Sequence, residues 1–362
     1  MSVPAQMRSL RCQPDAKVGV ETVAVPEPKD NEVLVKVKTV TLNPTDWKSA
    51  KFLGTPGYGV GCDAFGTVVK LGPKLNTQLK VGDNVAFFEM GSYHSAEKGT
   101  FSEYATTQSD TSVVVPTDFD PAQASSFGIG GFTAIQCLFT RLGLPAIPKD
   151  LSAPPALTKE SPKLLVWAAS TSVGQFAVQF GRLAGAHVIA TASPDNHAAI
   201  KELGAQDVFD YKDESTPAKI AEKYPDLQLA VDCFSEKGST VATANAISKK
   251  GGKVVNILPT EKAAKEARPD IEFITTLVYS FLGREFKFGG FGKFSPEQLK
   301  SDHAFLASWV AGEGSIVNNL MEKHLIKGNK IKVMSGGLDA IPEGMKFLEE
   351  GKVRMEKLAY DV

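Results

Sequence analysis

The sequence lacks the features that define several large classes of protein. Its 362 residues include 4 cysteines, which lie far apart without paired spacing, so neither a disulfide framework nor a structural zinc knuckle is predicted. The formal net charge of −1 provides no basic surface for nucleic acid. No apolar run approaches the roughly 18 residues needed to cross a bilayer, and the first residues contain no apolar signal-peptide core. We therefore expect an intracellular, cytoplasmic protein that binds neither nucleic acid nor a membrane.

The composition is that of a globular protein. Hydrophobic residues make up 43% of the chain and charged residues 22%, which are ordinary fractions for such proteins. A chain of this length can bury a large core and form two domains.

The clearest structural pattern lies between residues 163 and 192. An unbroken apolar run at 164–169 is typical of a strand buried on both faces of a parallel sheet. Apolar residues then recur at helical spacing from Val173 to Ala184, and Gly185 provides a helix C-cap. Residues 187–192 are the next strand candidate. The sequence therefore predicts one strand–helix–strand unit here.

The turn between this strand and helix is a candidate site for the pyrophosphate of a dinucleotide, because a helix N-terminus presents unpaired N–H groups. Only Gly174 remains of the usual three glycines, so a crossover without a ligand is an alternative. After the second strand, Ser193, Asn196 and His197 stand where NAD-binding folds place an acidic residue on the ribose. These hydrogen-bond donors favour a 2′-phosphate, and hence NADPH over NADH.

The remaining chain predicts two kinds of architecture. Short strand signals separated by turns fill the first part, up to about residue 116, with the clearest alternation at 33–40, where Val33, Val35, Val37 and Thr39 would share one face. Strand candidates at 207–211, 227–233 and 253–258 alternate with helical stretches and predict a doubly wound parallel sheet.

The proline-rich stretch 143–162 is expected to be a loop. The stretch 281–294, rich in glycine and phenylalanine, fits either an ordinary apolar loop or a substrate-lining flap. We expect the tail, ending in a strand at 357–362, to return to the first domain.

Several motifs occur together in a characteristic order: LNPTDWK at 42–48, GCDAFGTV at 61–68, VGDNV at 81–85, GTFSEYA at 99–105, AASTSVGQ at 168–175 and LGA at 203–205. With them the chain resembles the medium-chain dehydrogenase/reductase superfamily. It is most similar to the zinc-independent quinone and enoyl reductase branch, and in particular to the fungal trans-acting enoyl reductases. The resemblance implies an α/β fold with two domains and a cofactor between them. A GroES-like β-rich domain would comprise 1–131 and 308–362, and a Rossmann domain with a doubly wound parallel sheet 132–307.

The resemblance also bears on metal binding. Zinc-dependent members hold their catalytic ion with a cysteine at the position of Asn43, a histidine at that of Cys62 and a third ligand near 127–131. An asparagine supplies no thiolate, and a catalytic zinc site needs three protein ligands. We therefore predict a zinc-independent protein with no metal site.

The resemblance implies a set of cofactor contacts from several parts of the chain. They are Thr45, Asp46 and Lys48; Ser170, Thr171, Ser172 and Val173 at the pyrophosphate; Ser193, Asn196 and His197 at the 2′-phosphate; Tyr211 near the adenosine; Ile257 and Leu258 near the nicotinamide; and Lys352 with Val353. Alternatives remain for some of these residues. Lys48 and Lys352 fit solvated surface lysines equally well, and Tyr211, Ile257 and Leu258 fit ordinary core positions.

The leading hypothesis is an NADPH-dependent reductase that delivers hydride to the β-carbon of an activated alkene, namely an enoyl thioester, an enone or a quinone. Reduction of aldehydes is a second enzymatic hypothesis, and an NADPH-sensing or scaffold protein is a non-enzymatic one. No side chain is identifiable as the catalytic acid. The expected substrate is small and apolar, or an acyl thioester that can be bound to a carrier. Loops at 52–58, 128–132 and 279–294 would line its pocket. The insertion at 143–162 slightly favours a monomer over a homodimer.

Overall fold

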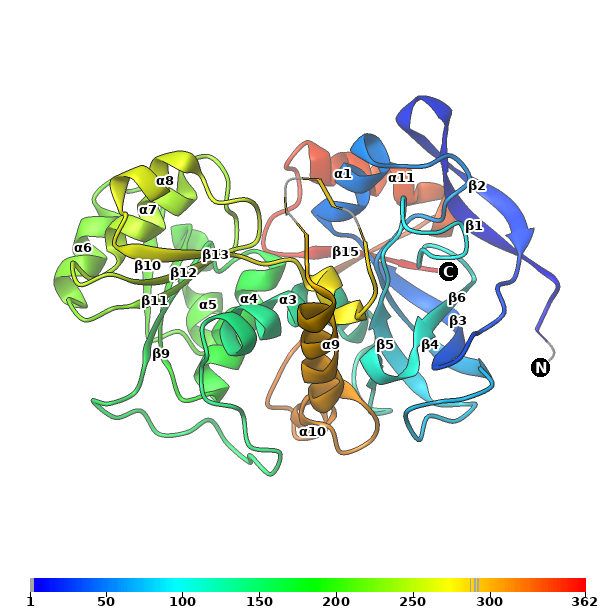
Figure 1. The fold of residues 1–362 in the computed structure, drawn as a ribbon, viewed down its shortest axis with the longest axis horizontal. Coiled ribbons are helices and arrows are strands. Elements are labelled where there is room, and N and C mark those ends of the chain that lie inside the picture. Colours follow the sequence, from blue (N-terminus) through cyan, green and yellow to red (C-terminus); the bar gives the residue numbers. More distant parts are fainter. Residues whose placement is uncertain (1–2, 287, 290, 292) are drawn as a thin grey trace. The chain divides into compact units, whose positions relative to one another are not determined.

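The computed structural model describes residues 3–286, 288, 289, 291 and 293–362. Its chain divides into two compact units (Figure 1). One comprises Met1–Ile129, Tyr279–Phe286 and Ser295–Val362, and the other comprises Gly130–Val278 and Lys287–Phe294. The Rossmann domain was predicted to include 279–307, but most of these residues belong to the first unit. Where the chain divides into independently folding domains stays a prediction.

The second unit contains the predicted parallel sheet. Its strands run in the order β10-β9-β8-β11-β12-β13, and all neighbouring strands are parallel. The strands are β8 (Lys163–Trp167), β9 (His187–Ala192), β10 (Asp207–Asp210), β11 (Leu229–Asp232), β12 (Gly252–Asn256) and β13 (Ile271–Thr275). Because this order reverses direction between β8 and β11, helices cover both faces of the sheet, with α4 and α5 on one and α6, α7 and α8 on the other (Figure 1).

The helices of the second unit follow the strands as predicted, with one surprise. They are α3 (Phe132–Ile135), α4 (Ser172–Leu183), α5 (His197–Glu202), α6 (Thr216–Lys223), α7 (Ser239–Ala246) and α8 (Lys262–Ala267), with a short 3-10 turn η5 (Pro194–Asn196). Two π-helical turns, η3 (Phe127–Gly131) and η4 (Gln136–Arg141), flank α3. The apolar spacing of residues 133–142 predicts a helix, and the structure forms it there as α3 followed by the π-helical turn η4. The stretch 143–162 contains no helix or strand among its described residues, as expected for a loop.

The first unit is built on a second, mainly antiparallel sheet. Its strands run in the order β14-β15-β3-β4-β5-β7, and β6 also pairs with β3. They are β3 (Glu32–Thr41), β4 (Asp63–Leu71), β5 (Asn84–Phe88), β6 (Tyr104–Gln108), β7 (Val113–Val114), β14 (Ile331–Met334) and β15 (Lys357–Asp361). The prediction that alternate residues of 33–39 share a buried face is confirmed, because Val33, Val35, Val37 and Thr39 are all buried. The expected return of the tail is confirmed as well, since β15 pairs with β3.

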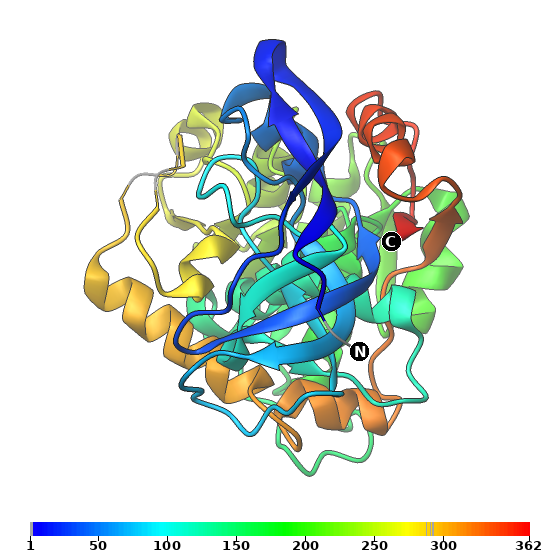
Figure 2. The same cartoon turned by 90° about the vertical axis from the view of Figure 1, so that its right-hand side faces the viewer.

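A two-stranded hairpin and several helices complete the first unit. The strands β1 (Gln6–Gln13) and β2 (Lys17–Ala24) form the hairpin and are joined by η1 (Pro14–Ala16). The turn of the hairpin extends away from the rest of the unit (Figure 2). The helices are α1 (Pro44–Phe52), α2 (Pro121–Ser125), α9 (Pro296–Val310), α10 (Ile316–Glu322) and α11 (Gly337–Glu349), with 3-10 turns η2 (Ser109–Thr111) and η6 (Val278–Leu282).

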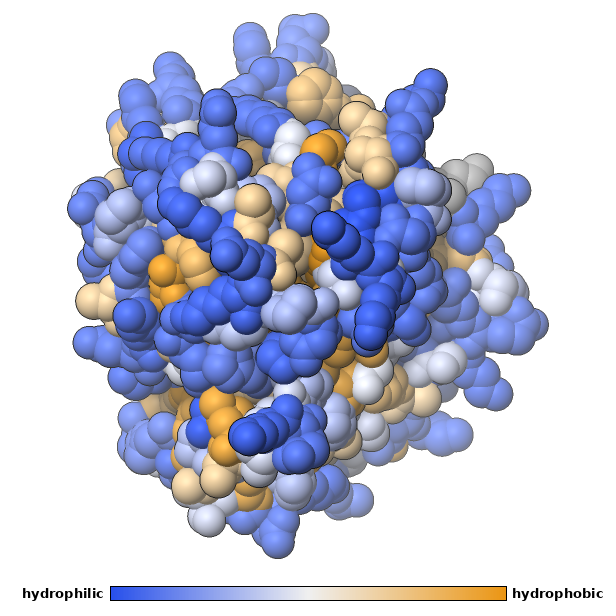
Figure 3. Space-filling model, turned by 90° about the vertical axis from the view of Figure 1, so that its left-hand side faces the viewer, coloured by the Kyte–Doolittle hydropathy of each residue, from blue (hydrophilic) through white to orange (hydrophobic). Residues whose placement is uncertain are grey.

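The visible surface is mostly polar. The face in Figure 3 is largely hydrophilic, and its hydrophobic residues lie in small separate groups. Among the described residues, none of the helices combines the length and the apolar character needed to cross a membrane.

Candidate functional site

The carboxyl edge of the parallel sheet brings together segments that are distant in sequence. The strand register aligns Trp167 of β8 with Asp232 of β11, and Asp232 with Asn256 of β12. The residues that follow these strands therefore lie along one edge, at the point where the strand order reverses. Open α/β sheets bind their ligands at this position.

The turn after β8 is shaped for close packing of the helix that follows. Ala168 adopts a left-handed conformation with φ of 59°. Thr171 caps α4, since its Oγ1 accepts a hydrogen bond from the N–H of Gly174 at 3.1 Å and donates to the carbonyl of Ala168 at 2.9 Å. A Cβ at Gly174 would lie 2.6 Å from Ala169 Cα, so only glycine fits there. The predicted residues Ser170, Thr171, Ser172 and Val173 thus surround the N-terminus of a 12-residue helix, where unpaired N–H groups suit a pyrophosphate.

The ends of β9 and β10 bring the predicted phosphate contacts together. The register pairs Ala192 with Asp210, so Ser193 and Tyr211 follow on adjacent strands. Asn196 Nδ2 donates to Ser193 Oγ at 3.1 Å, and Tyr211 is 46% exposed, so it is not a core residue. These residues form a polar group open to solvent at the tip of the two strands.

Two details of this strand tip were not foreseen. The Nε2 atom of His197 lies 3.1 Å from the carbonyl of Ala192, so only its Nδ1 remains for a ligand, and Nδ1 donates only in the imidazolium form. Lys212 Nζ lies 6.0 Å from the centre of the Tyr211 ring and adds a positive charge. A lysine directly after the strand-end tyrosine was the signal that sequence reasoning overlooked.

The end of β12 carries the two predicted nicotinamide contacts. Ile257 and Leu258 are both partly exposed, so they are not ordinary core residues, and the N–H of Ile257 donates to Ser235 Oγ at 3.1 Å. Phe234, which follows β11 on the same edge, is 37% exposed and was not predicted. These side chains give this part of the edge an apolar surface.

The predicted contacts at the far end of the chain are less distinctive. Lys352 is exposed and forms an ion pair with Glu350 at 2.6 Å, as a surface lysine does. Val353 is partly buried against the core of the first unit. Lys48 lies with Nζ 5.8 Å from the ring centre of Trp47. The geometry of these three residues does not test whether they bind the cofactor, so that role stays a prediction.

In the first unit, the segments that hold zinc in zinc-dependent relatives meet at a buried ion pair. Lys357 Nζ donates to Asp63 Oδ2 at 2.8 Å and to Asn43 Oδ1 at 2.7 Å. Asn43 Nδ2 also donates to Asp63 Oδ2 at 2.9 Å, and the N–H of Ile129 donates to Asp63 Oδ1 at 2.7 Å. Lys357 is 4% exposed and Asp63 is fully buried. Among the described residues, no three His, Cys, Asp or Glu side chains are grouped to hold a metal ion.

Beside this ion pair lies a cluster of buried groups that can carry protons. The phenol oxygen of Tyr279 lies 3.1 Å from Thr45 Oγ1 and 3.2 Å from Cys62 Sγ. Burial raises the pKa of Tyr279 and that of Cys62 well above their ordinary values, so both stay protonated at neutral pH. Burial also raises the pKa of Asp46, which is 1% exposed, to about 7.

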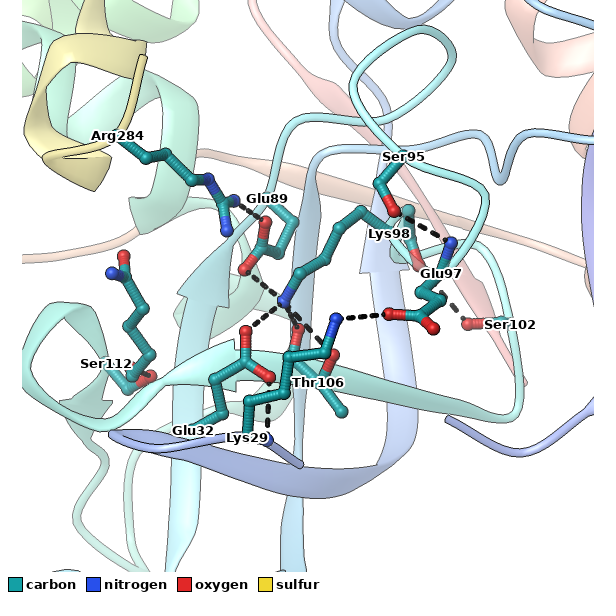
Figure 4. A network of polar contacts seen from close by, with 12 residues as sticks. Lys29, Glu32, Glu89, Ser95, Glu97, Lys98, Ser102, Thr106, Ser112 and Arg284 are labelled. Atoms are coloured by element: carbon teal, nitrogen blue, oxygen red, sulfur yellow. Dashed lines mark hydrogen bonds and ion pairs between the residues drawn. The ribbon is translucent and has the colours of Figure 1, made fainter. Parts of the chain in front are cut away.

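A network of charged residues ties the segment 279–286 to the β strands of the same unit (Figure 4). Lys98 Nζ donates to Glu32 Oε1 at 2.7 Å, to Glu89 Oε1 at 3.3 Å and to the Thr106 hydroxyl at 3.1 Å. Arg284 binds the other oxygen of Glu89. Although burial alone favours a neutral carboxyl, Arg284 and Lys98 together lower the pKa of Glu89. Glu89 is therefore a fully buried carboxylate that joins two cations.

The loops expected to line a substrate pocket are described in part. Residues 52–58 and 128–132 lie within the described structure, whereas 287, 290 and 292 of the stretch 279–294 lie outside the described residues. In the first part of that stretch Tyr279, Phe281 and Leu282 are buried, which agrees with an apolar loop packed on the core.

Comparisons with known proteins identify the family. Residues 29–117 match the alcohol dehydrogenase GroES-like domain, and residues 172–287 match the zinc-binding dehydrogenase family. The trans-enoyl reductase ACTTS2 of Alternaria alternata is 36% identical over 358 residues, with 98% of both chains covered. The trans-enoyl reductase traG of Penicillium crustosum is 32% identical over 368 residues, covering 99% of this chain and 98% of that one.

Solved structures share the fold. The JamJ enoyl reductase matches with a TM-score of 0.69 at 17% identity, covering 98% of this chain and 99% of that one. The quinone oxidoreductase of Coxiella burnetii matches with a TM-score of 0.69 at 21% identity over 99% of both chains. Dinucleotide-binding geometry, a GroES-like sheet and close full-length relatives agree. The chain therefore belongs to the medium-chain dehydrogenase/reductase superfamily and is an oxidoreductase of the enoyl reductase type.

Proposed function

We propose that the protein is an NADPH-dependent, zinc-independent enoyl reductase that delivers hydride to the β-carbon of an enoyl thioester. The observation that carries the proposal is the 36% full-length identity to a trans-enoyl reductase, combined with an intact helix N-terminus for a pyrophosphate. A bound reduced nicotinamide would supply the hydride. The chain's own residues bind and orient the cofactor and supply the proton.

The choice of NADPH is supported by the donors at the ends of β9 and β10. Ser193, Asn196 and Tyr211 can donate hydrogen bonds to a 2′-phosphate, and Lys212 adds a positive charge. A dianionic phosphate gains from each of these contacts, whereas the ribose hydroxyl of NADH gains little from the charge.

Independence of zinc is supported by the ion pair of Lys357 and Asp63. The oxygens of Asn43 and Asp63 that face this site already accept hydrogen bonds from an ammonium group. A divalent ion at the same place would have to displace this buried cation.

The substrate is proposed to be an acyl thioester, which a carrier protein can present, because relatives are named trans-enoyl reductases. The partly exposed apolar residues Phe234, Ile257 and Leu258 support an apolar acyl chain. A monomeric, cytoplasmic protein stays a prediction, which light scattering and cell fractionation would test.

The test is steady-state oxidation of NADPH and NADH with a panel of enoyl thioesters, enones, quinones and aldehydes. We expect turnover of enoyl thioesters with NADPH and a saturated acyl product by mass spectrometry. Reduction of aldehydes with no reduction of any alkene would overturn the proposal, as would equal use of both cofactors.

A further inference from the structure

The loop that joins β11 to α7 lies within the second unit and contains residues in the left-handed conformation. Ser235, Lys237 and Gly238 have φ of 57°, 55° and 82°. Glycine adopts this conformation freely, whereas a residue with a Cβ adopts it only at a cost in free energy. Strained residues persist where the contacts around them hold the backbone in place. At Ser235 the side chain itself supplies such contacts.

The Ser235 hydroxyl joins the ends of two neighbouring strands. Its Oγ donates to the carbonyl of Asp232, the last residue of β11, at 2.9 Å. The same Oγ accepts from the N–H of Ile257, the first residue after β12, at 3.1 Å. The pairing of β11 with β12 ends at Asp232 and Asn256, so this hydroxyl connects the two chain segments beyond the end of the ladder. Ser235 is 3% exposed, so neither hydrogen bond competes with bulk water.

The carboxyl group of Asp232 fixes the same loop. Its Oδ1 accepts from the N–H groups of Phe234 and Ser235 at 3.1 and 3.0 Å. Its Oδ2 accepts from the hydroxyls of Ser239 and Thr240 at 2.7 and 2.9 Å. Because Asp232 is fully buried, these hydrogen bonds leave the loop little freedom to move. The loop therefore gives the Ser235 hydroxyl a fixed position from which it holds Ile257.

The residues held in this way form part of the apolar surface at the carboxyl edge of the sheet. Phe234 directly precedes Ser235 and is 37% exposed, and Ile257 is partly exposed. Ile257 is also one of the two predicted nicotinamide contacts. A buried hydroxyl thus determines where two exposed apolar residues stand.

We propose that Ser235 is a positioning residue, whose hydroxyl fixes Phe234 and Ile257 as a wall for the nicotinamide and thereby sets the rate of hydride transfer. This inference rests on the proposed function. The pyrophosphate turn and the strand tip at Ser193 would provide most of the affinity for NADPH through their polar contacts. Loss of the Ser235 hydroxyl should therefore slow the chemical step and leave cofactor binding nearly unchanged.

Two substitutions separate positioning from a purely structural role. Ser235→Gly removes the hydroxyl but also relieves the left-handed strain, so its two effects on stability oppose one another. Ser235→Thr keeps a hydroxyl but places a β-branched residue in that conformation, which lowers stability. A hydroxyl that only stabilises the loop predicts that activity follows stability. A positioning hydroxyl predicts a slow Ser235→Gly and an active but less stable Ser235→Thr.

The test compares these variants with the control Lys237→Gly, which makes the same change at an exposed left-handed residue of the same loop. For Ser235→Gly we expect kcat with an enoyl thioester to fall by about tenfold or more, because a misplacement of about 1 Å can cost about a hundredfold. The Kd for NADPH, from fluorescence titration, should change by less than about threefold. With NADPH deuterated at the transferred C4 position, the isotope effect on kcat should rise, since hydride transfer then limits turnover more strongly. Ser235→Thr and Lys237→Gly should keep the wild-type isotope effect, and Ser235→Thr should unfold at a lower urea concentration than the wild type.

A second measurement needs no turnover. The emission of a reduced nicotinamide depends on how closely its surroundings hold the ring. At saturating NADPH, the fluorescence enhancement should therefore be smaller for Ser235→Gly than for the wild type, and unchanged for Lys237→Gly.

The outcomes separate the positioning role from the proposed function. A Ser235→Gly variant with wild-type kcat, isotope effect and emission would overturn the positioning role, as would losses of activity that follow stability across the variants. If Ser235→Thr does not fold, the comparison of Ser235→Gly with Lys237→Gly decides. A wild-type protein that binds NADPH but reduces no alkene refutes the proposed reaction, and the emission of the bound cofactor then decides the role of Ser235. A wild-type protein that binds no NADPH refutes both.

Discussion

Replacing Asp46 by asparagine should remove a pH dependence from the stability of the protein. Asp46 is 1% exposed, and its Oδ2 accepts a hydrogen bond from the N–H of Asn43 at 2.6 Å. Among the described residues, its Oδ1 atom is buried without a hydrogen-bond partner. Burial, with a smaller contribution from the charge of Asp63, raises its pKa from 3.8 to about 7, against the opposing effects of Asn43, Cys62 and Lys357.

The magnitude follows from proton linkage. Because the pKa of Asp46 is higher in the folded than in the unfolded protein, the folded state binds more protons between about pH 4 and about pH 7. The stabilisation by this proton is fully present below the unfolded pKa and is lost as the pH rises through the folded one. Over the whole range it amounts to about 4 kcal/mol, and between about pH 5.5 and about pH 8.5 to about 2 kcal/mol. An asparagine is neutral throughout and can still accept the hydrogen bond from Asn43.

The measurement is the free energy of unfolding by urea at these two pH values, for the wild type, Asp46→Asn and the exposed control Asp30→Asn. We expect the wild type and Asp30→Asn to lose about 2 kcal/mol more than Asp46→Asn on going to the higher pH. An Asp46→Asn variant that loses as much as the wild type, or that is the least stable of the three at the higher pH, would refute the reasoning.

Three further substitutions or treatments test other parts of the structure. Ser193→Asp should raise the KM for NADPH by about tenfold or more and leave that for NADH nearly unchanged, whereas Ser152→Asp in an exposed loop should change neither; equal effects on both cofactors would contradict the phosphate site. Arg284→Met should lower the free energy of unfolding by about 3 kcal/mol, because it leaves the buried charge of Glu89 with Lys98 alone. Adding Glu89→Gln should recover part of this loss. Additive losses in a double-mutant cycle would argue against coupling between Arg284 and Glu89. Dialysis against a strong chelator should leave activity intact, with far less than one zinc per chain by elemental analysis, and stoichiometric zinc required for turnover would end the metal-independent interpretation.

The elements that were predicted correctly have strong local patterns. The run at 164–169 has no polar residue, as a strand covered on both faces requires, and its first four residues lie in β8. The strand β1 was missed because Arg8 and Arg11 interrupt its apolar residues, and β13 because only the five residues of Ile271–Thr275 alternate there. The helix at Gln136–Arg141 was predicted but its π-helical form was not, since apolar spacing does not reveal the hydrogen-bond register.

In the candidate site, too, the residues in continuous segments were predicted and the contacts between distant residues were not. The pyrophosphate turn and the strand ends were predicted because each is a continuous segment whose residue types indicate the ligand that it can bind. Tyr279 lies in a loop that was expected to line the pocket, but its contact with Thr45 was not found, since it joins residues 234 positions apart. Lys357 and Asp63 are separated by 294 positions. No local pattern marks such a pair, and it is only the closure of β15 onto β3 that brings the tail to this position.

The buried Lys357 disfavours a metal ion at this place through its charge, whereas Asn43 disfavours it only by lacking a thiolate. Asn43 alone indicated that a thiolate is lacking, which leaves open whether another arrangement of ligands could hold an ion. In the structure, Lys357 already neutralises Asp63, and burying a second cation beside it would cost several kcal/mol without a new anion. Without a Lewis acid, negative charge on a substrate carbonyl must be met by hydrogen-bond donors. The proposal of a zinc-independent reductase therefore rests on the buried charge of Lys357 as well as on the ligand that Asn43 does not supply.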